Sequence, residues 1–221
     1  MSDNELLALL ILQHTPNLGD GSIKKLIQQF GSAAQVMGEK KSNLLAVEGI
    51  GEHKLSAFGK EEYYAFAKAE LNYIKNNGIT ITAYTDHNYP LRLKHCIDGP
   101  VLLYSRGNIN WNNPRILSIV GTRKITTYGE RFINDFIAEI APLNPLIVSG
   151  FAYGVDIAAH KACIAHGLQN IGVLAHGLNQ IYPKPHAKYV NEVEKNGGFV
   201  TDFWSSSKFV HTNFLQRNRI I

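Results

Sequence analysis

The sequence predicts an α/β protein: an extended Rossmann-like, mostly parallel sheet with helices on both faces, preceded by a small all-α domain of helix-hairpin-helix or SAM-like type. Helix-patterned apolar stripes and glycine turns fill residues 1–78, and short Val, Ile and Leu runs alternate with amphipathic segments from Arg115 onward. Strands that alternate with helices indicate a parallel sheet with right-handed crossovers. We therefore expect a helical domain at residues 1–78 and a Rossmann-like domain at residues 79–221.

The first domain begins with two apolar stripes, starting at Leu6 and Ile23, which predict two helices. The stretch LLAVEGIGEHKLSAF follows, in which Gly49 and Gly51 separate two short helical patterns in the form of a helix-hairpin-helix. Such glycines permit a tight turn and expose amides to a backbone phosphate, so these two residues are candidates for contact with duplex DNA. The alternative is a helical module whose glycines only close turns. A long helix at residues 61–76 ends the domain.

The second domain opens with strands and turns punctuated by Pro90, Pro100 and Gly107. Beyond them we expect strands at residues 116–120, 146–148, 171–174 and 199–201, and helices at residues 128–140, 156–166 and 186–196. Ligands of open parallel sheets bind at the carboxyl ends of the strands. The loops that follow these strands are therefore the first place to look for a site.

Composition sets broad limits on function. The 221 residues carry 22 Lys and Arg against 18 acids, a net charge of +4, which permits an anionic partner without requiring one. Cys96 and Cys163 lie far apart, and the nine histidines show no metal-ligand spacing, so neither a disulfide framework nor a metal site is expected. No apolar run has the length of a membrane span, and the stretch Met1–Glu5 lacks the basic and apolar layout of a signal peptide. We expect a reduced, cytoplasmic protein.

Four segments fall at the predicted ligand edge, residues 121–124, 149–156, 176–184 and 214–219. They contribute cationic side chains and aromatic rings: Arg123, Lys124, Lys184, Arg217 and Arg219, with Phe151, Tyr153, Tyr182 and Phe214. This combination suits a single-stranded nucleic acid, because phosphates take charge and amides while unstacked bases lie on rings, at about 1–3 kcal/mol per base. Arg123 stands where a dinucleotide-binding loop would carry glycine, and its guanidinium fork fits a phosphate.

Several of these residues have a simpler interpretation. Phe151 fits equally well in the core, Tyr182 in a packed turn, and Asp156 at a helix N-cap. Catalysis needs a base beside a nucleophile, and the sequence shows no such pair, so no catalytic residue is predicted. Arg217 and Arg219 are harder to explain by packing, since burying them unpaired would be costly.

At these loops the sequence resembles the DNA-processing protein A family (DprA, also called Smf). The matching stretches are IVGTRKITTYG, SGFAYGVDIAAHKACI, GLNQIYPKPH and NFLQRNRII, with YP…GPVLLYSRGN upstream. The resemblance spans nearly the whole chain and implies a Rossmann-like protein that binds single-stranded DNA, shields it, and loads the RecA recombinase in natural transformation and recombination. It implies no enzymatic activity and no cofactor. With Phe151 from the second loop, the implied DNA-binding positions are Gly121, Thr122, Arg123, Ser149, Gly150, Phe151, Gly154, Lys184, Asn213, Phe214, Arg217 and Arg219.

The resemblance also bears on partners. Relatives continue past the Arg219-Ile220-Ile221 end with further helix and strand that complete the sheet and help form a homodimer. We therefore expect the Rossmann-like domain to be incomplete at its C-terminus. Homodimerisation and RecA contact are assigned to that later half of the fold.

Three other functions fit the sequence less well. A Rossmann-like enzyme acting on nucleoside monophosphates is the first alternative, but its PGGxGTxxE loop is absent. An NAD-dependent enzyme would carry an acid at the ribose, where Ser149 stands. A structural or protein-docking module leaves the arginines at the predicted edge unexplained.

Overall fold

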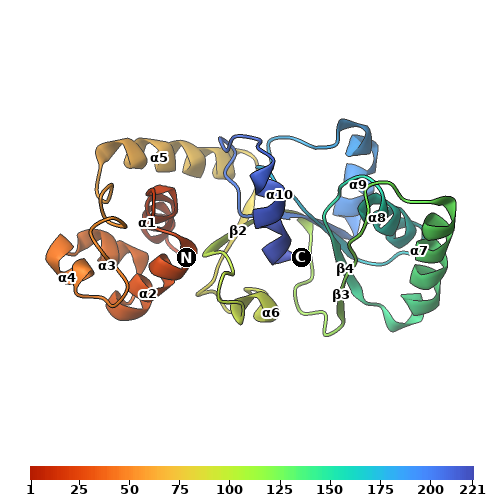
Figure 1. The fold of residues 1–221 in the computed structure, drawn as a ribbon, viewed down its shortest axis with the longest axis horizontal. Helices are drawn as coiled ribbons and strands as arrows, with labels where there is room; N and C mark the ends of the chain where they lie inside the picture. Colours follow the sequence, from red (N-terminus) through yellow and green to blue (C-terminus); the bar gives the residue numbers. More distant parts are fainter. The chain divides into compact units, whose positions relative to one another are not determined.

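The computed structural model describes all 221 residues and divides them into two compact units (Figure 1). The first unit comprises Met1–Ile79 with Ala83–Leu102, and the second comprises Thr80–Thr82 with Leu103–Ile221. A helical region therefore precedes an α/β region, and the predicted fold class is confirmed. The domain boundary near Gly78 stays a prediction. Residues 83–102, which lie beyond it in the chain, are grouped with the first unit.

The first unit is built from α1 (Asp3–His14), α2 (Asp20–Phe30), α3 (Ala33–Gly38), α4 (Lys41–Leu45), α5 (Glu61–Asn76) and α6 (Leu91–Lys94). Helix α1 is its central element, because an unbroken run of buried residues from Ala8 to Leu12 leaves it apolar on all sides. Glu5 also ties α1 to α3: its carboxylate oxygens accept hydrogen bonds from the amides of Ala33 (2.8 Å) and Ala34 (2.9 Å). That carboxylate satisfies amides that an isolated helix would leave open.

The glycine hairpin forms only in part. Helix α4 leads to Gly49, whose φ of +80° suits glycine, but residues 52–59 form a series of turns and no regular second helix. Gly59, at φ +78°, ends the segment. Lys54 Nζ donates to the Gly49 carbonyl (2.8 Å), so one carbonyl of the turn is paired locally.

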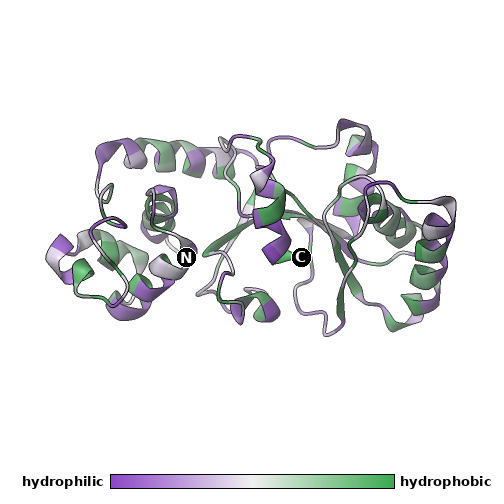
Figure 2. Cartoon of the chain, viewed as in Figure 1, coloured by the Kyte–Doolittle hydropathy of each residue, from purple (hydrophilic) through white to green (hydrophobic).

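The second unit contains a six-stranded sheet in the order β1-β2-β6-β5-β4-β3. The strands are β1 (Thr80–Ala83), β2 (Leu102–Asn108), β3 (Ile116–Ser118), β4 (Leu146–Ser149), β5 (Asn170–Val173) and β6 (Gly197–Thr201). Strands β3 to β6 are parallel, and β2 runs antiparallel to β6. Every residue of β4 and β5 is buried, so both faces of the central parallel strands are covered, and these strands are hydrophobic in Figure 2.

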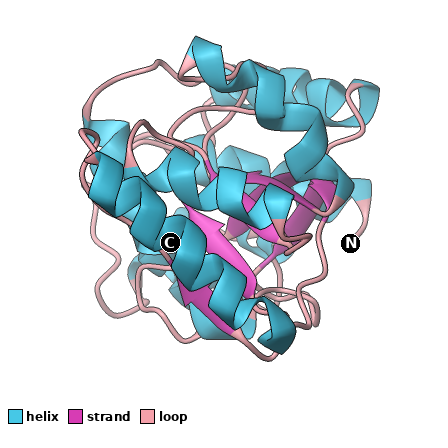
Figure 3. Ribbon diagram, turned by 90° about the vertical axis from the view of Figure 1, so that its right-hand side faces the viewer, coloured by secondary structure: helices cyan, strands magenta, loops and turns pink.

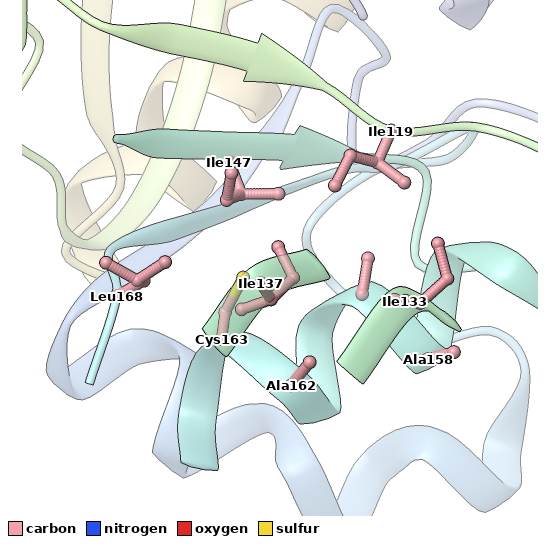
Figure 4. Packing of buried hydrophobic residues seen from close by; sticks show 9 residues of the cluster. Ile119, Ile133, Ile137, Ile147, Ala158, Ala162, Cys163 and Leu168 are labelled. Carbon is pink, nitrogen blue, oxygen red and sulfur yellow. The ribbon is translucent and has the colours of Figure 1, made fainter. Parts of the chain in front are cut away.

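Helices connect the parallel strands as predicted. Helix α7 (Thr127–Ile140) joins β3 to β4, and α8 (Val155–Ala165) joins β4 to β5; seen from the α7 side, they lie in front of the strands (Figure 3). The predicted helix at residues 186–196 is split into the 3-10 helix η2 (Lys184–Tyr189) and α9 (Val190–Lys195). One core cluster joins β4, α7 and α8 through residues such as Ile147, Ile137 and Cys163 (Figure 4).

The C-terminal segment differs from its prediction as a loop. It forms helix α10 (Thr212–Arg217) and the 3-10 turn η3 (Asn218–Ile220). A helix there brings Asn213 and Arg217, four residues apart, onto one buried face. No helix of the protein has both the length and the apolar character that crossing a membrane would need.

Candidate nucleic-acid interface

The loop after β3 is exposed but held by the neighbouring helix. Gly121, Thr122 and Arg123 are all exposed. The amide of Val155, at the start of α8, donates to the Thr122 carbonyl (3.1 Å). Gly154, at φ +79°, makes this contact possible, since a Cβ there would lie 2.1 Å from the Thr122 oxygen. Arg123 is thus presented to solvent from a loop whose backbone is fixed.

Beneath this loop lies a buried charge pair. Arg217 is only 4% exposed, and its Nη1 donates to the Val173 carbonyl at the end of β5. A Cβ on Gly150 would lie 2.1 Å from Arg217 Nη1 and 2.5 Å from Asp156 Oδ2, so this glycine makes room for both groups. Burial lowers the pKa of Arg217 and the Asp156 charge opposes that shift. Burial likewise raises the pKa of Asp156 against the effect of Arg217.

Asp156 takes a role that the sequence did not predict. It is the second residue of α8 and not its N-cap, a position that Gly154 holds. Its Oδ2 accepts from the Ala152 amide (3.3 Å) inside the loop after β4. The carboxylate therefore fixes this loop while facing Arg217.

Together these groups line a cavity of about 380 Å³. Four of the predicted DNA-binding residues line it: Gly121, Arg123, Phe214 and Arg217. Asp156 lines it as well. The Arg123 guanidinium carbon lies 5.0 Å from the centre of the Phe214 ring, within the range of a cation–π contact. A solvent-facing arginine fork, a ring beside it and a buried arginine below make a cavity suited to an anion attached to an apolar group.

Other predicted residues support this cavity from within. Ser149 Oγ donates to the Ile119 carbonyl (2.7 Å), which braces the strand end beneath the first loop. Asn213 Nδ2 donates to the Ala175 carbonyl (3.2 Å) and so anchors α10 to the end of β5. Phe151 is fully buried, with its ring 4.9 Å from that of Phe199, so no base could stack on it. Its expected contact with DNA is corrected to a role in packing.

Two predicted cations lie outside the cavity lining. Arg219 is partly buried and forms an ion pair with Asp202. Lys184 is exposed at the start of η2, and the segment before it reaches Phe214 through Tyr182, with ring centres 6.1 Å apart. Gly49 and Gly51 belong to the first unit, where both are exposed, and their contact with duplex DNA stays a prediction.

The structure adds an aromatic residue that sequence reasoning missed. Phe209 lies with its ring centre 4.7 Å from that of Tyr182 and 5.6 Å from that of Phe214. The only signal in the sequence was the apolar pair Phe209-Val210 within an otherwise polar connection, Ser205 to Lys208 before it and His211-Thr212 after it. Such an isolated pair does not reveal which rings it meets.

A buried histidine behind the site gives a pH-dependent prediction. Burial lowers the pKa of His160 to about 4 from the ordinary 6.5. Its Nδ1 donates to Asn170 Oδ1 (2.7 Å), while Asn170 Nδ2 donates to the Leu168 carbonyl. Between these two pKa values the unfolded chain binds a proton that the native protein does not. The free energy of unfolding should therefore fall by up to about 3 kcal/mol as the pH drops through this window.

Urea unfolding at pH 7, 6 and 5 measures this effect. His160→Gln keeps a hydrogen-bonding side chain but does not titrate, so its stability should vary less with pH than that of the wild type. Burial also lowers the pKa of His176 and of His186, so part of the wild-type slope should remain. Equal slopes in the two proteins would show that His160 is not protonated differently in the folded and unfolded states.

Known proteins resemble this chain in sequence and in fold. The model of the family described as DNA recombination-mediator protein A matches residues 80–221. The chain is 32% identical over 162 residues to the DNA processing protein DprA of Bacillus subtilis, covering 73% of this chain and 54% of that protein. It is 35% identical over 136 residues to the protein Smf of Borreliella burgdorferi, covering 61% and 43%. The chain thus spans about half the length of these relatives.

Two solved structures resemble the fold. The DNA processing protein A of Streptococcus pneumoniae matches 99% of this chain and 74% of its own, with a TM-score of 0.70 and 22% identity. The DNA processing protein A of Helicobacter pylori, whose structure addresses its single-stranded DNA binding mode, matches 65% of this chain and 64% of its own, with a TM-score of 0.57 and 28% identity. With the family model covering more than half of its residues, the chain belongs to the DNA recombination-mediator protein A family.

Proposed function

We propose that this protein binds single-stranded DNA at the cavity below Arg123, as a non-enzymatic mediator of recombination. The observation that carries the proposal is the convergence of Arg123, Phe214 and Arg217 on one cavity from segments far apart in the chain. The exposed cation fits a phosphate, and the neighbouring rings fit the base attached to it. The single-stranded DNA binding of the Helicobacter pylori relative supports the same partner.

Family membership supports a wider proposal. We propose that the protein shields incoming DNA and loads RecA onto it. We also propose that it forms a homodimer and lies in the cytoplasm. Lys184 and Arg219, outside the cavity lining, extend the proposed path of the strand beyond the cavity. The first unit, with Gly49 and Gly51, is proposed as an accessory contact to the DNA backbone.

Arg123→Ala tests the site directly. At low salt we expect its affinity for an oligothymidylate to fall about tenfold, because a charged hydrogen bond to phosphate is lost. The logarithm of affinity should also depend less steeply on the logarithm of salt concentration, by about 0.7, since one fewer phosphate is neutralised. Titration by fluorescence anisotropy at two salt concentrations measures both quantities.

Arg131→Ala is the matched control, because Arg131 is an exposed arginine of α7 outside the cavity. It removes the same charge and should change neither affinity nor salt dependence by a comparable amount. If the two variants behave alike, the cavity is not the DNA site. Turnover of a nucleoside monophosphate panel by the wild type would instead favour the enzymatic alternative.

A further inference from the structure

Three aromatic rings beside the cavity form a continuous group that is open to solvent. Tyr182 and Phe209 are each 42% exposed, and their ring centres lie 4.7 Å apart with the planes tilted by 55°. Phe214 lies 5.6 Å from Phe209 and 6.1 Å from Tyr182. The exposed surface is thus a shared patch built from two connections, and not a single stray ring.

The connection that carries Phe209 is anchored at both sides of the residue. Asn213 Nδ2 donates to the Lys208 carbonyl (2.9 Å), and the Asn213 amide donates to the Val210 carbonyl (3.1 Å). Earlier in the connection, the Ser207 amide donates to the carbonyl of buried Trp204 (3.0 Å). These bonds fix the backbone around Phe209, so the ring is held in place while part of its surface faces water.

The aromatic group lies directly beside the cationic fork. Phe214 lies near both the Arg123 guanidinium and the Phe209 ring. One ring therefore separates a phosphate-binding group from an exposed aromatic pair.

We infer that Tyr182 and Phe209 form a stacking platform for a nucleobase of the strand whose phosphate Arg123 binds. The inference rests on the proposed function and adds to it a second, uncharged component of recognition. A platform of this kind accepts every base, because each base has a π face. The contribution of stacking to affinity is therefore tolerant of sequence, and it depends little on salt because the rings carry no charge.

Phe209→Ala tests the platform with two ligands, an oligothymidylate and an abasic deoxyribose-phosphate oligomer of the same length. We expect the variant to bind the oligothymidylate about fivefold to a hundredfold more weakly than the wild type does. Binding of the abasic oligomer should be unchanged, and so should the salt dependence, because no charge is removed. Arg123→Ala should instead weaken both ligands and lower the salt dependence.

Two further variants separate stacking from packing. Phe209→Leu keeps apolar volume against Tyr182 but offers no flat ring, so it should lose affinity as the alanine variant does. Phe209→Trp should retain affinity, and its added indole fluorescence should be quenched by the oligothymidylate. Equal loss on both ligands would mean that Phe209 only holds the connection, and an unchanged affinity in all three variants would remove the platform. Absence of any binding by the wild type would instead refute the proposed function.

Discussion

Replacing Arg217 with Ala is expected to lower the free energy of unfolding by about 3–5 kcal/mol at neutral pH. The substitution removes a buried guanidinium and leaves the Asp156 carboxylate, itself 6% exposed, without its countercharge. It also leaves the Val173 carbonyl without the Arg217 donor. Equilibrium unfolding in urea measures the loss. Arg217, which the sequence suggested as a phosphate ligand, is thus expected to act first as a support of the cavity floor.

The pH dependence of this loss identifies its cause. Without Arg217 the pKa of Asp156 should rise further, because the guanidinium is the largest of the influences that oppose the effect of burial. The penalty should therefore shrink as the pH falls and the carboxyl group takes up a proton. Arg106→Ala is the control, since Arg106 pairs with Glu194 (2.6 Å) in the same unit, where the two side chains are 33% and 25% exposed. It should cost about 1 kcal/mol or less. Comparable losses in both variants would contradict a buried charge pair at Arg217.

Gly154→Ala is expected to destabilise the protein by at least about 2 kcal/mol and to abolish DNA binding at the cavity. Gly154 has φ +79° and ψ −124°, a conformation that residues with a side chain rarely adopt. A Cβ would also lie 2.1 Å from the Thr122 oxygen and 2.6 Å from the Arg123 carbonyl carbon, and both are backbone atoms. Relief of these contacts must move the loop that presents Arg123.

Gly167→Ala separates strain from collision. Gly167 also has a positive φ, +68°, but nothing lies within 4 Å of a Cβ placed there. This variant should cost about 1 kcal/mol and leave affinity for an oligothymidylate unchanged. Thermal unfolding and an anisotropy titration of both variants provide the comparison. If Gly154→Ala bound DNA as Gly167→Ala does, the close contact between α8 and the first loop would not be needed for the site.

Most of the second unit could be predicted from the sequence, because its pattern is local. Val, Ile and Leu runs and the stripe of α7 carry their periodicity within a few residues, and the loops after the strands follow from strand order. The second arm of the glycine hairpin was predicted as helical and is not, since the apolar pattern of so short a segment does not decide between a helix and a series of turns.

The residue types at the site could also be predicted, and Arg123 lies where its loop indicated. What only the tertiary structure decided was exposure. Phe151 and Arg217 are buried while Phe209 is half exposed, although the three side chains look equally available in the sequence. Burial depends on which distant segments approach: Phe199 on β6 covers Phe151, and Asp156 on α8 receives Arg217. A side chain's neighbours across the sheet are not encoded within its own segment, so its role at the site follows from the folded chain alone.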